Sequence, residues 1–306
     1  MAESIRCLVI GANGFVGSHL VDELAEAGYK VIAFDRFSSP QKFHKNDNIK
    51  VLPGDIFDDG AIRRSLKNVD YVFHCFSATT PFLSDTDPYA DITLNILRNV
   101  QLFEQFVAAG IKKALYISSG GAVYGSISEK SSAKETDAPS PVSPYGIGKL
   151  GTEYYLTYFK RKFGLKSISY RLTNPYGPRQ VTNKNQGVVG TFIDKIKNNQ
   201  EITVFGNSSR DYIYVRDATK MIVNSFTRST KHSVYNIGSG QQIHLDDLIT
   251  TIEDALNIKA KINRVDPPKT FLRKSQVSID RFKNEFGEVR ITELQKGILR
   301  TIKAHK

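Results

Sequence analysis

Short apolar runs typical of β-strands alternate with helical patterns through the first half of the chain. The strand-like runs cover residues 5–10, 30–35, 49–52, 71–76, 114–118 and 167–172, and helical patterns lie between them at 17–27, 62–66, 91–109 and 145–163. This alternation is typical of βαβ crossovers, which join neighbouring strands of a parallel sheet. We therefore predict an α/β fold built on a parallel sheet.

The pattern changes at about residue 173, where Asn, Gly and Pro begin to cluster. We predict that residues 1–173, with a return near 211–239, form the first domain. Residues 174–210 and 240–306 are expected to form a smaller C-terminal α/β lobe that binds substrate. No internal repeat or low-complexity linker separates the two, so we expect one compact body with a cleft between the lobes.

The charge of the chain is positive but dispersed. Its 306 residues include 42 Lys or Arg and 31 Asp or Glu, a formal net charge of +11. The densest basic run, Lys160-Arg161-Lys162, lies where a helical pattern ends, which indicates a solvated helix end. No apolar run approaches the roughly 20 residues that cross a bilayer. We expect neither nucleic-acid binding nor membrane insertion.

The cysteines and histidines favour a cytoplasmic protein without a metal. Cys7 and Cys75 lie inside apolar runs, which fits buried thiols in a reducing compartment better than a disulfide framework. The first apolar run stops at Gly11, too early for a signal peptide. His19 and His74 have no second ligand at metal spacing, so we expect no metal site.

A glycine-rich turn follows the first strand directly. Its sequence is Gly11-Ala12-Asn13-Gly14-Phe15-Val16-Gly17, and a helical pattern follows. Such glycines allow a tight turn, close approach of the backbone to a pyrophosphate and close helix packing, although the spacing is GxxGxxG and not GxGxxG. Strand, turn and helix in this order predict a dinucleotide-binding, Rossmann-like doubly wound sheet.

Asp35 closes the second strand-like run. A carboxylate at that place can bind the hydroxyl groups of the adenosine ribose, and it repels a 2′-phosphate. Asp35 therefore favours NAD over NADP as the cofactor, although the adjacent Arg36 could weaken that preference.

Tyr145 and Lys149 form a YxxxK pattern at the start of a helical stretch. Residues at i and i+4 share one helix face, so the ammonium group lies close to the phenol. A free tyrosine has a pKa near ~10, and a neighbouring cation and an oxidised nicotinamide both lower it. Tyr145 would then be a usable acid and base. The alternative interpretation is an amphipathic helix with a tyrosine anchor.

Several motifs occur in a fixed order along the chain: GANGFVG, Asp35, Gly54-Asp55-Ile56, SSGGAVYG, YGIGK, YRLTNPYGPRQ and SRDYIYVRD. With these motifs the sequence resembles the extended short-chain dehydrogenases/reductases, and within them the nucleotide-sugar epimerases of the UDP-glucose 4-epimerase type. The resemblance runs from about residue 5 to the C-terminus. It implies an NAD domain, a lobe for a nucleoside-diphosphate sugar, and a homodimer formed through the helices at 91–109 and 145–163.

The resemblance also implies roles for individual residues. The pyrophosphate of NAD would be held by Gly11, Gly14 and Gly17, with Phe15 and Val16 between them. Asp35 would bind the adenosine ribose, Asp55 and Ile56 would contact the adenine, and Lys149 would bind the nicotinamide ribose. The cofactor would also be lined by Phe76, Ser77, Ala78 and Asn95. For the substrate, Asn174 and Arg210 would contact the diphosphate, Arg273 would be a second clamp, and Gln186, Gly187 and Val188 would pack on the nucleotide.

One departure from the family concerns catalysis. The family's usual catalytic Ser or Thr falls on Gly120, which has no side chain to contact the sugar 4-hydroxyl. Either Ser119, or Thr79 or Thr80, supplies this contact, or Tyr145 acts alone. We favour Ser119, which lies with Gly120 at a strand end; the alternative is a hydroxyl that bonds the local backbone of a turn. An inactive or slow homologue also stays open.

The next two residues bear on the type of reaction. The 4,6-dehydratases of this superfamily carry Asp-Glu where this chain has Gly121-Ala122, and dehydration is disfavoured without a carboxylate. Epimerisation needs only a hydride acceptor and one acid/base. We therefore predict an NAD-dependent nucleotide-sugar 4-epimerase that works through a transient 4-keto intermediate with Tyr145 as acid/base. The alternatives are an NAD(P)H-dependent 4-reductase, a 4,6-dehydratase, or a non-catalytic NAD-binding homologue.

The size of the sugar's substituent at carbon 2 bears on the substrate. The resemblance places Val277 near the position that limits bulk there. Because valine is small, we expect a UDP-hexose or a UDP-N-acetylhexosamine as substrate.

Overall fold

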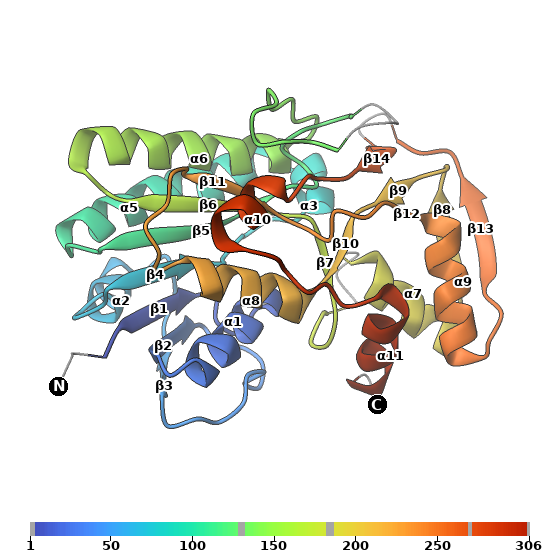
Figure 1. Ribbon diagram of the computed structural model, residues 1–306, viewed down its shortest axis with the longest axis horizontal. Coiled ribbons are helices and arrows are strands. Elements are labelled where there is room, and N and C mark those ends of the chain that lie inside the picture. The colour runs from blue at the N-terminus through green and yellow to red at the C-terminus, as the bar shows by residue number, and fades with distance from the viewer. Residues whose placement is uncertain (1–3, 128–131, 182–186, 269–270, 305–306) are drawn as a thin grey trace. The chain divides into compact units, whose positions relative to one another are not determined.

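The computed structural model describes residues 4–127, 132–181, 187–268 and 271–304. Its main sheet has seven parallel strands in the order β11-β6-β5-β4-β1-β2-β3 (Figure 1). These strands are β1 (Arg6–Ile10), β2 (Lys30–Asp35), β3 (Ile49–Pro53), β4 (Tyr71–His74), β5 (Lys113–Ser119), β6 (Ser167–Leu172) and β11 (Val234–Ile237). The order reverses between β1 and β4, where a doubly wound sheet binds its ligand. The predicted Rossmann-like fold is confirmed.

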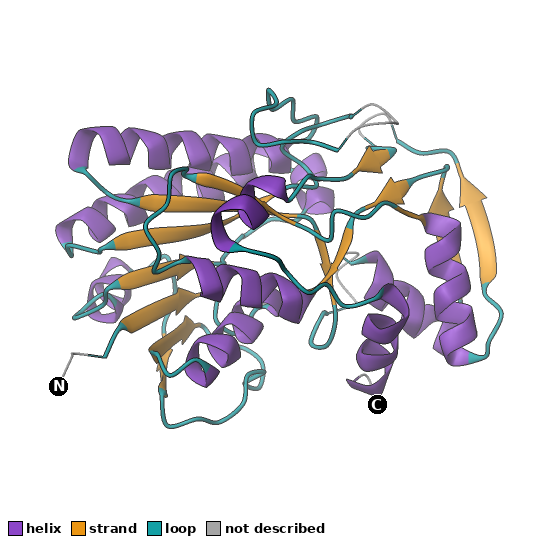
Figure 2. Ribbon diagram, in the orientation of Figure 1, coloured by secondary structure: helices purple, strands orange, loops and turns teal. Residues whose placement is uncertain are grey.

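Helices cover both faces of this sheet (Figure 2). On one face lie α2 (Asp59–Ser65), α5 (Arg98–Ala108) and α6 (Pro144–Phe163), and on the other lie α1 (Phe15–Glu26) and α8 (Val215–Ser225). On the first face the rings of Phe103 and Phe159 are 5.7 Å apart, and on the second Phe226 lies 5.0 Å from Phe73. Because both faces are covered, β1, β5 and β6 are buried over most of their length, including the polar residues of β6, whereas β3 at the sheet edge is largely exposed.

The predicted helix at 91–109 is divided, and further helical turns precede it. The preceding turns are α3 (Pro81–Thr86) and α4 (Pro88–Asp91). The first part of the predicted helix is a π-helical segment, η1 (Ile92–Leu97), which continues into α5. Pro81 and Pro88 each stand in the first turn of a short helix, after Thr80 and Asp87 as N-caps, a combination that starts helices readily. The π segment carries Asn95 to a buried position.

The C-terminal part of the chain adds shorter elements. The strands are β7 (Asn174–Tyr176), β8 (Glu201–Phe205), β9 (Ser209–Arg210), β10 (Tyr212–Tyr214), β12 (Ile243–His244), β13 (Lys261–Val265) and β14 (Lys274–Ser275), and the helices are α7 (Val188–Lys197), α9 (Leu245–Leu256), α10 (Asp280–Phe286) and α11 (Leu294–Ala304). The strands form three small sheets, β10-β7, β12-β9-β14 and β13-β8. The apolar faces of α7, α9 and α11 form a separate core with β8 and β10.

The described residues fall into two compact units. One takes residues from 1–118, 144–170 and 219–235, and the other from 119–143, 171–218 and 236–306. The main difference from the division expected from sequence is the segment 119–143. It belongs to the second unit because Ala133 bridges Val277 and the carboxylate of Glu135 accepts a hydrogen bond from the Asn236 amide. The predicted role of the C-terminal lobe in binding a sugar nucleotide stays a prediction.

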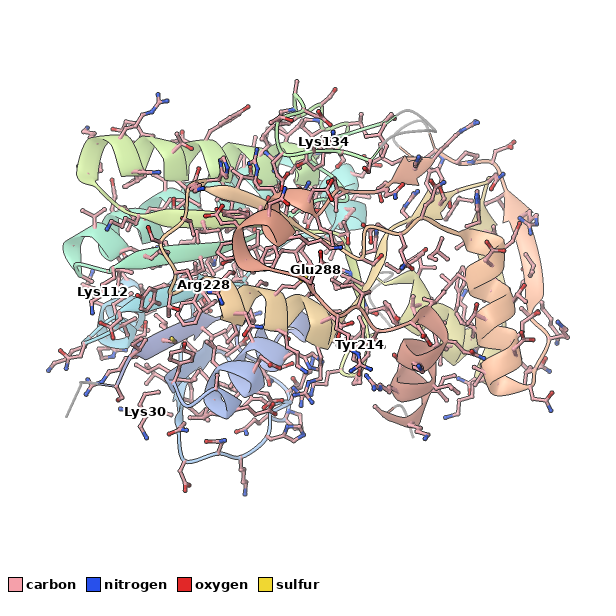
Figure 3. The ribbon with its side chains drawn as sticks, viewed as in Figure 1. Lys30, Lys112, Lys134, Tyr214, Arg228 and Glu288 are labelled. Carbon is pink, nitrogen blue, oxygen red and sulfur yellow. The ribbon has the colours of Figure 1, made fainter. Side chains whose placement is uncertain are left out.

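Basic side chains also lie at the strand edge away from the glycine-rich turn. Lys30 begins β2 and Lys112 directly precedes β5, and both are labelled in Figure 3. Lys112 is paired with Asp70 at 2.8 Å.

Among the described residues, no helix is long and apolar enough to cross a membrane, and no group of three or more His, Cys, Asp or Glu is arranged to hold a metal ion. The thiols of Cys7 and Cys75 are free.

Candidate active site

The glycine-rich turn is so tight that side chains would not fit in it. Gly11 has a φ of +82°, and a Cβ there would lie 3.0 Å from the Phe76 amide nitrogen. A Cβ on Gly17 would lie 2.0 Å from the carbonyl oxygen of Gly11. Gly14 is the N-cap of α1 and provides no side-chain hydrogen bond. The N–H groups of the first helical turn, among them those of Phe15 and Val16, are of the kind that binds a phosphate.

Asp35 is fixed at the end of β2 beside this turn. Its Oδ2 accepts a hydrogen bond from the Asn13 amide at 2.9 Å, and its Oδ1 accepts one from the Arg36 amide at 2.7 Å. A carboxylate has about four lone-pair sites, so capacity is left for ribose hydroxyls. The Arg36 side chain is exposed. The geometry therefore fits the adenosine side of NAD.

Two further segments, at 55–56 and 76–78, carry residues that were expected to contact the cofactor. Asp55 Oδ1 accepts a hydrogen bond from the Phe57 amide at 3.0 Å, and the carbonyl oxygen of Ile56 accepts one from Arg98 Nε at 2.7 Å. After β4, Ala78 donates its amide to Asn95 Oδ1 at 2.8 Å. The π segment thus holds in place the chain that follows β4.

Tyr145 and Lys149 lie in one small pocket of the first unit. The pocket is lined by Phe76, Ser77, Asp91, Asn95, Asn99, Tyr116, Tyr145, Gly148 and Lys149. Lys149 Nζ donates to the carbonyl oxygen of Ile117 at 3.0 Å and lies 5.6 Å from the Tyr145 ring centre and 5.0 Å from that of Tyr116. Sequence reasoning placed Tyr145, Lys149, Asn95, Phe76 and Ser77 in one site, and the structure brings all five together.

Burial controls the protonation of Lys149. Removal from water lowers the pKa of its ammonium group to about 8, and the carboxylates of Asp91 and Glu153 act in the opposite direction. A pKa of about 8 leaves Lys149 mostly protonated at neutral pH, as a cation that stabilises a phenolate must be.

In the second unit, Ser119 and Asn174 meet over Gly121. A Cβ on Gly121 would lie 3.7 Å from Asn174 Oδ1 and 4.0 Å from Ser119 Oγ. Asn174 Nδ2 donates to the Asp211 carbonyl oxygen at 2.9 Å, which fixes the amide. Ser119 Oγ makes no hydrogen bond to any residue that the structure describes, so the hydroxyl is available to a ligand.

Gly120 is a glycine because its surroundings leave no room. A Cβ there would lie 2.7 Å from the carbonyl oxygen of Arg171 and 3.2 Å from a methyl carbon of Val277. Val277 is completely buried, and a Cβ on Gly238 would lie 2.8 Å from its other methyl group. A larger residue at 277 therefore cannot be accommodated without displacing this packing.

Thr79 and Thr80, the alternative sources of the hydroxyl, are both engaged. Thr79 Oγ1 donates to the carboxylate of Asp91 and is buried. Thr80 Oγ1 accepts a hydrogen bond from the Leu83 amide and caps α3. Ser119 is therefore better placed than either threonine for a ligand hydroxyl.

The expected phosphate clamps lie on neighbouring strands. Arg210 is in β9. Its Nη1 donates to the Ser209 carbonyl oxygen at 2.9 Å, and its Nη2 donates to the Leu272 carbonyl oxygen. Its guanidinium carbon lies 5.2 Å from the Phe271 ring centre. Arg273, which is exposed, directly precedes β14, the strand beside β9. Val188 begins α7 and is 41% exposed. Gln186 lies outside the described residues.

A sequence profile described as the NAD dependent epimerase/dehydratase family matches residues 7–238, more than half of the chain. The chain belongs to the NAD-dependent epimerase/dehydratase family. It is 33% identical to the dTDP-4-dehydro-6-deoxyglucose reductase of Escherichia coli over 314 residues, which cover 97% of this chain and 96% of the reductase.

Two solved structures extend this comparison. The UDP-glucose 4-epimerase of Thermotoga maritima with UDP-glucose superposes with a TM-score of 0.91 at 33% identity over 98% of each chain. The UDP-glucose 4-epimerase of Thermus thermophilus in complex with NAD gives a TM-score of 0.91 at 27% identity, again over 98% of each chain. These findings confirm the predicted family, its Rossmann-like fold and its NAD dependence.

Sequence reasoning missed the buried polar residues that surround the family's Tyr-Lys pair. Asp91 is 2% exposed, and His74 Nε2 lies 2.6 Å from Asn99 Oδ1. Burial lowers the pKa of His74 to about 4, so its ring is neutral. Only Gly148, directly before Lys149, gave a signal in the sequence, because a glycine inside a helix often marks a close approach.

Proposed function

We propose that this chain is a nucleotide-sugar 4-epimerase that acts on a UDP-hexose or UDP-N-acetylhexosamine through a transient 4-keto sugar. The observation that carries the proposal is the pocket in which the Tyr145 ring lies 5.6 Å from the buried Lys149 ammonium. A phenol beside a buried cation is a suitable acid/base at neutral pH.

The cofactor residues would be those of the glycine-rich turn, Asp35, the segments at 55–56 and 76–78, and Asn95. Bound NAD supplies the hydride acceptor at sugar carbon 4 and returns the hydride. Tyr145 Oη takes the proton of the 4-hydroxyl and later gives it back, while Lys149 stabilises the phenolate and binds the nicotinamide ribose. The planar 4-keto carbon of the sugar can take either configuration, which is the inversion that a 4-epimerase performs.

The substrate would be held by residues of the second unit. Ser119 Oγ would donate to or accept from the sugar 4-hydroxyl, at the place where Gly120 has no side chain. Asn174 and the guanidinium groups of Arg210 and Arg273 would bind the diphosphate, with Val188 against the nucleotide. Among the described residues, Arg210 donates to two carbonyl oxygens of its own unit, and a guanidinium has five N–H groups, so others would serve the diphosphate.

A 4-reductase is the second candidate, because the Escherichia coli relative that is 33% identical over 97% of this chain is a dTDP-4-dehydro-6-deoxyglucose reductase. A reductase would use the same tyrosine and lysine but would consume a reduced nicotinamide cofactor in each turnover. Dehydration stays disfavoured because Gly121 and Ala122 provide no carboxylate.

One experiment separates these functions. The purified protein is denatured to quantify released NAD, and native protein is incubated without added cofactor with UDP-glucose, UDP-galactose and their N-acetyl counterparts, followed by NMR. We expect interconversion, lost by at least about 100-fold in Tyr145→Phe and retained in Tyr154→Phe, which removes an exposed phenol from the same helix. NADH oxidation with dTDP-4-dehydro-6-deoxyglucose, and no interconversion, would establish the reductase instead.

A further inference from the structure

The pocket of Tyr145 and Lys149 contains a buried carboxylate that the proposed chemistry does not use. Asp91 ends α4 and is 2% exposed. Its Oδ1 accepts hydrogen bonds from Thr79 Oγ1 and, at 2.9 Å, from Asn95 Nδ2. Both donors are neutral, so these bonds solvate the carboxylate without balancing its charge. Burial of a charge is costly unless an opposite charge is near.

The other oxygen of this carboxylate lies against α6 at Gly148, where an added side chain would collide with it. A Cβ on Gly148 would lie 1.9 Å from Asp91 Oδ2 and 3.0 Å from its Cγ. Both distances are far below contact, and the nearer atom belongs to a side chain held by two hydrogen bonds. Gly148 therefore brings the Asp91 carboxylate against the backbone of α6 one residue before Lys149, and both residues line the same pocket.

Lys149 is the buried cation of this pocket, and few of its neighbours carry negative charge. Burial raises the pKa of the Cys75 thiol to about 12 and lowers that of His74 to about 4, so both are neutral at physiological pH. Burial also raises the pKa of Tyr116. The anions that remain are Asp91 and Glu153, and the Glu153 carboxylate accepts a hydrogen bond from Ser118 Oγ at 2.5 Å.

We propose that Asp91 is a positioning residue whose carboxylate stabilises the charge of Lys149 across the pocket that both residues line, and that Gly148 is a glycine in order to admit it. The inference rests on the proposed acid/base role of Tyr145 beside Lys149. Asp91 keeps the ammonium protonated inside a pocket that would otherwise favour the neutral amine. Without it, Lys149 loses its proton at lower pH and no longer stabilises the tyrosine phenolate.

The test follows the proton of Lys149 directly. Full-length protein labelled with ¹³C at the lysine ε-carbons is titrated by NMR, with and without NAD, and the Lys149 resonance is assigned by its loss in Lys149→Met. We expect a midpoint near pH 8 in the unmodified protein and a decrease of about one pH unit or more in Asp91→Asn. Asp91→Ser, which keeps a donor and an acceptor for Thr79 and Asn95, gives the same test if the asparagine variant does not fold.

Asp87→Asn is the matched control. It removes an exposed carboxylate four positions earlier, and an asparagine can still accept the hydrogen bond that Asp87 Oδ1 receives from the Ala90 amide. No change of the Lys149 midpoint is expected there. An unchanged midpoint in the Asp91 variants, or an equal shift in Asp87→Asn, overturns the proposal.

Turnover provides the second readout. In Asp91→Asn the basic limb of the pH profile of kcat/KM should move to lower pH by the same amount as the NMR midpoint, which a merely structural loss of activity would not cause. If the unmodified protein turns over none of the UDP-sugars while the NMR midpoint still shifts, the 4-epimerase proposal is wrong and the pairing of Asp91 with Lys149 stands.

Discussion

Gly120 and Gly121 are neighbours in the chain, yet their surroundings differ sharply. A Cβ on Gly120 would lie 2.7 Å from a backbone oxygen, whereas the nearest atom to a Cβ on Gly121 is 3.7 Å away. The missing family hydroxyl at 120 is thus a property of the local packing, in which the Val277 side chain and the Arg171 carbonyl occupy the space. Ser119, one residue earlier, carries the only hydroxyl between positions 119 and 122.

A serine placed at position 120, as in the family pattern, should therefore not supply a catalytic hydroxyl. We expect Gly120→Ser to lower the free energy of unfolding by about 1–3 kcal/mol, because the backbone oxygen of Arg171 cannot move away cheaply. We expect no gain in turnover, measured with the substrate of the unmodified protein, while unfolding is followed in urea.

Gly121→Ser is the control for this substitution, since it adds the same side chain where there is room. Its stability should stay within about 0.5 kcal/mol of the parent. A Gly120→Ser variant that is both stable and more active would contradict the assignment of the hydroxyl to Ser119.

Individual residues were predicted from sequence wherever the chemistry is local. The glycines of the turn at 11–17 and the pair Tyr145 and Lys149 depend on spacings of a few residues, which the sequence displays. Asp91 could not be found in this way, because it meets Gly148 only through the packing of α4 on α6. The same holds for the collision that excludes a side chain at Gly120.

Among the elements, η1 shows how a local change of helix type positions a site. A π-helical turn adds a residue to the turn and shifts the side chains that follow. Here it buries Asn95, whose amide bonds the Ala78 amide, the Thr79 hydroxyl and the Asp91 carboxylate. A pattern with a 3.6-residue period cannot reveal such a turn, which is why residues 91–109 were predicted as one continuous helix.

Removal of the Asn95 side chain should therefore weaken more than one contact. We expect Asn95→Ala to cost about 1–3 kcal/mol of unfolding free energy, because the half-buried Ala78 amide loses its acceptor and the buried Asp91 carboxylate loses a donor. Released NAD per protein should also fall, since the segment after β4 is no longer held.

Thr93→Ala provides the comparison within the same π-helical segment. Thr93 is exposed, and its hydroxyl donates to backbone carbonyl oxygens of the preceding turn, those of Tyr89 at 2.9 Å and Ala90 at 3.5 Å. Its loss should change stability by less than about 0.5 kcal/mol. Equal effects of the two substitutions on stability and NAD content would show that Asn95 has no special role.

At the scale of the whole molecule, the apolar pattern was sufficient for six of the seven strands of the main sheet, and β11 was not predicted. Two of the predicted strands, at 30–35 and 167–172, have the predicted bounds. The C-terminal strands were not individually predicted. Several are two or three residues long, too short for a pattern to show.

The exposed face of α6 suggests how two copies of the chain meet. Tyr154 is 62% exposed, Tyr158 is 45% exposed and Phe163 is 47% exposed. Large apolar side chains in such a group are typical of an interaction surface. We propose the homodimer implied by the family resemblance, formed through this helix.

The double variant Tyr154→Glu, Tyr158→Glu should accordingly be a monomer. Sedimentation equilibrium should give twice the chain mass for the parent protein and a single chain mass for the variant, because four buried carboxylates would repel one another across a two-fold interface. Val51→Glu, on the exposed strand β3, should remain a dimer. A parent protein that sediments as a monomer would refute the proposed assembly.

The contact between Gly148 and Asp91 also limits the order in which these positions can change during evolution. Any side chain at 148 would meet a carboxylate 1.9 Å away, so a descendant with a larger residue there must first have lost the bulk of Asp91. The reverse order passes through a collision inside the catalytic pocket. Lineages that keep aspartate at 91 should therefore keep glycine at 148, whereas lineages that have shortened residue 91 are free to vary both.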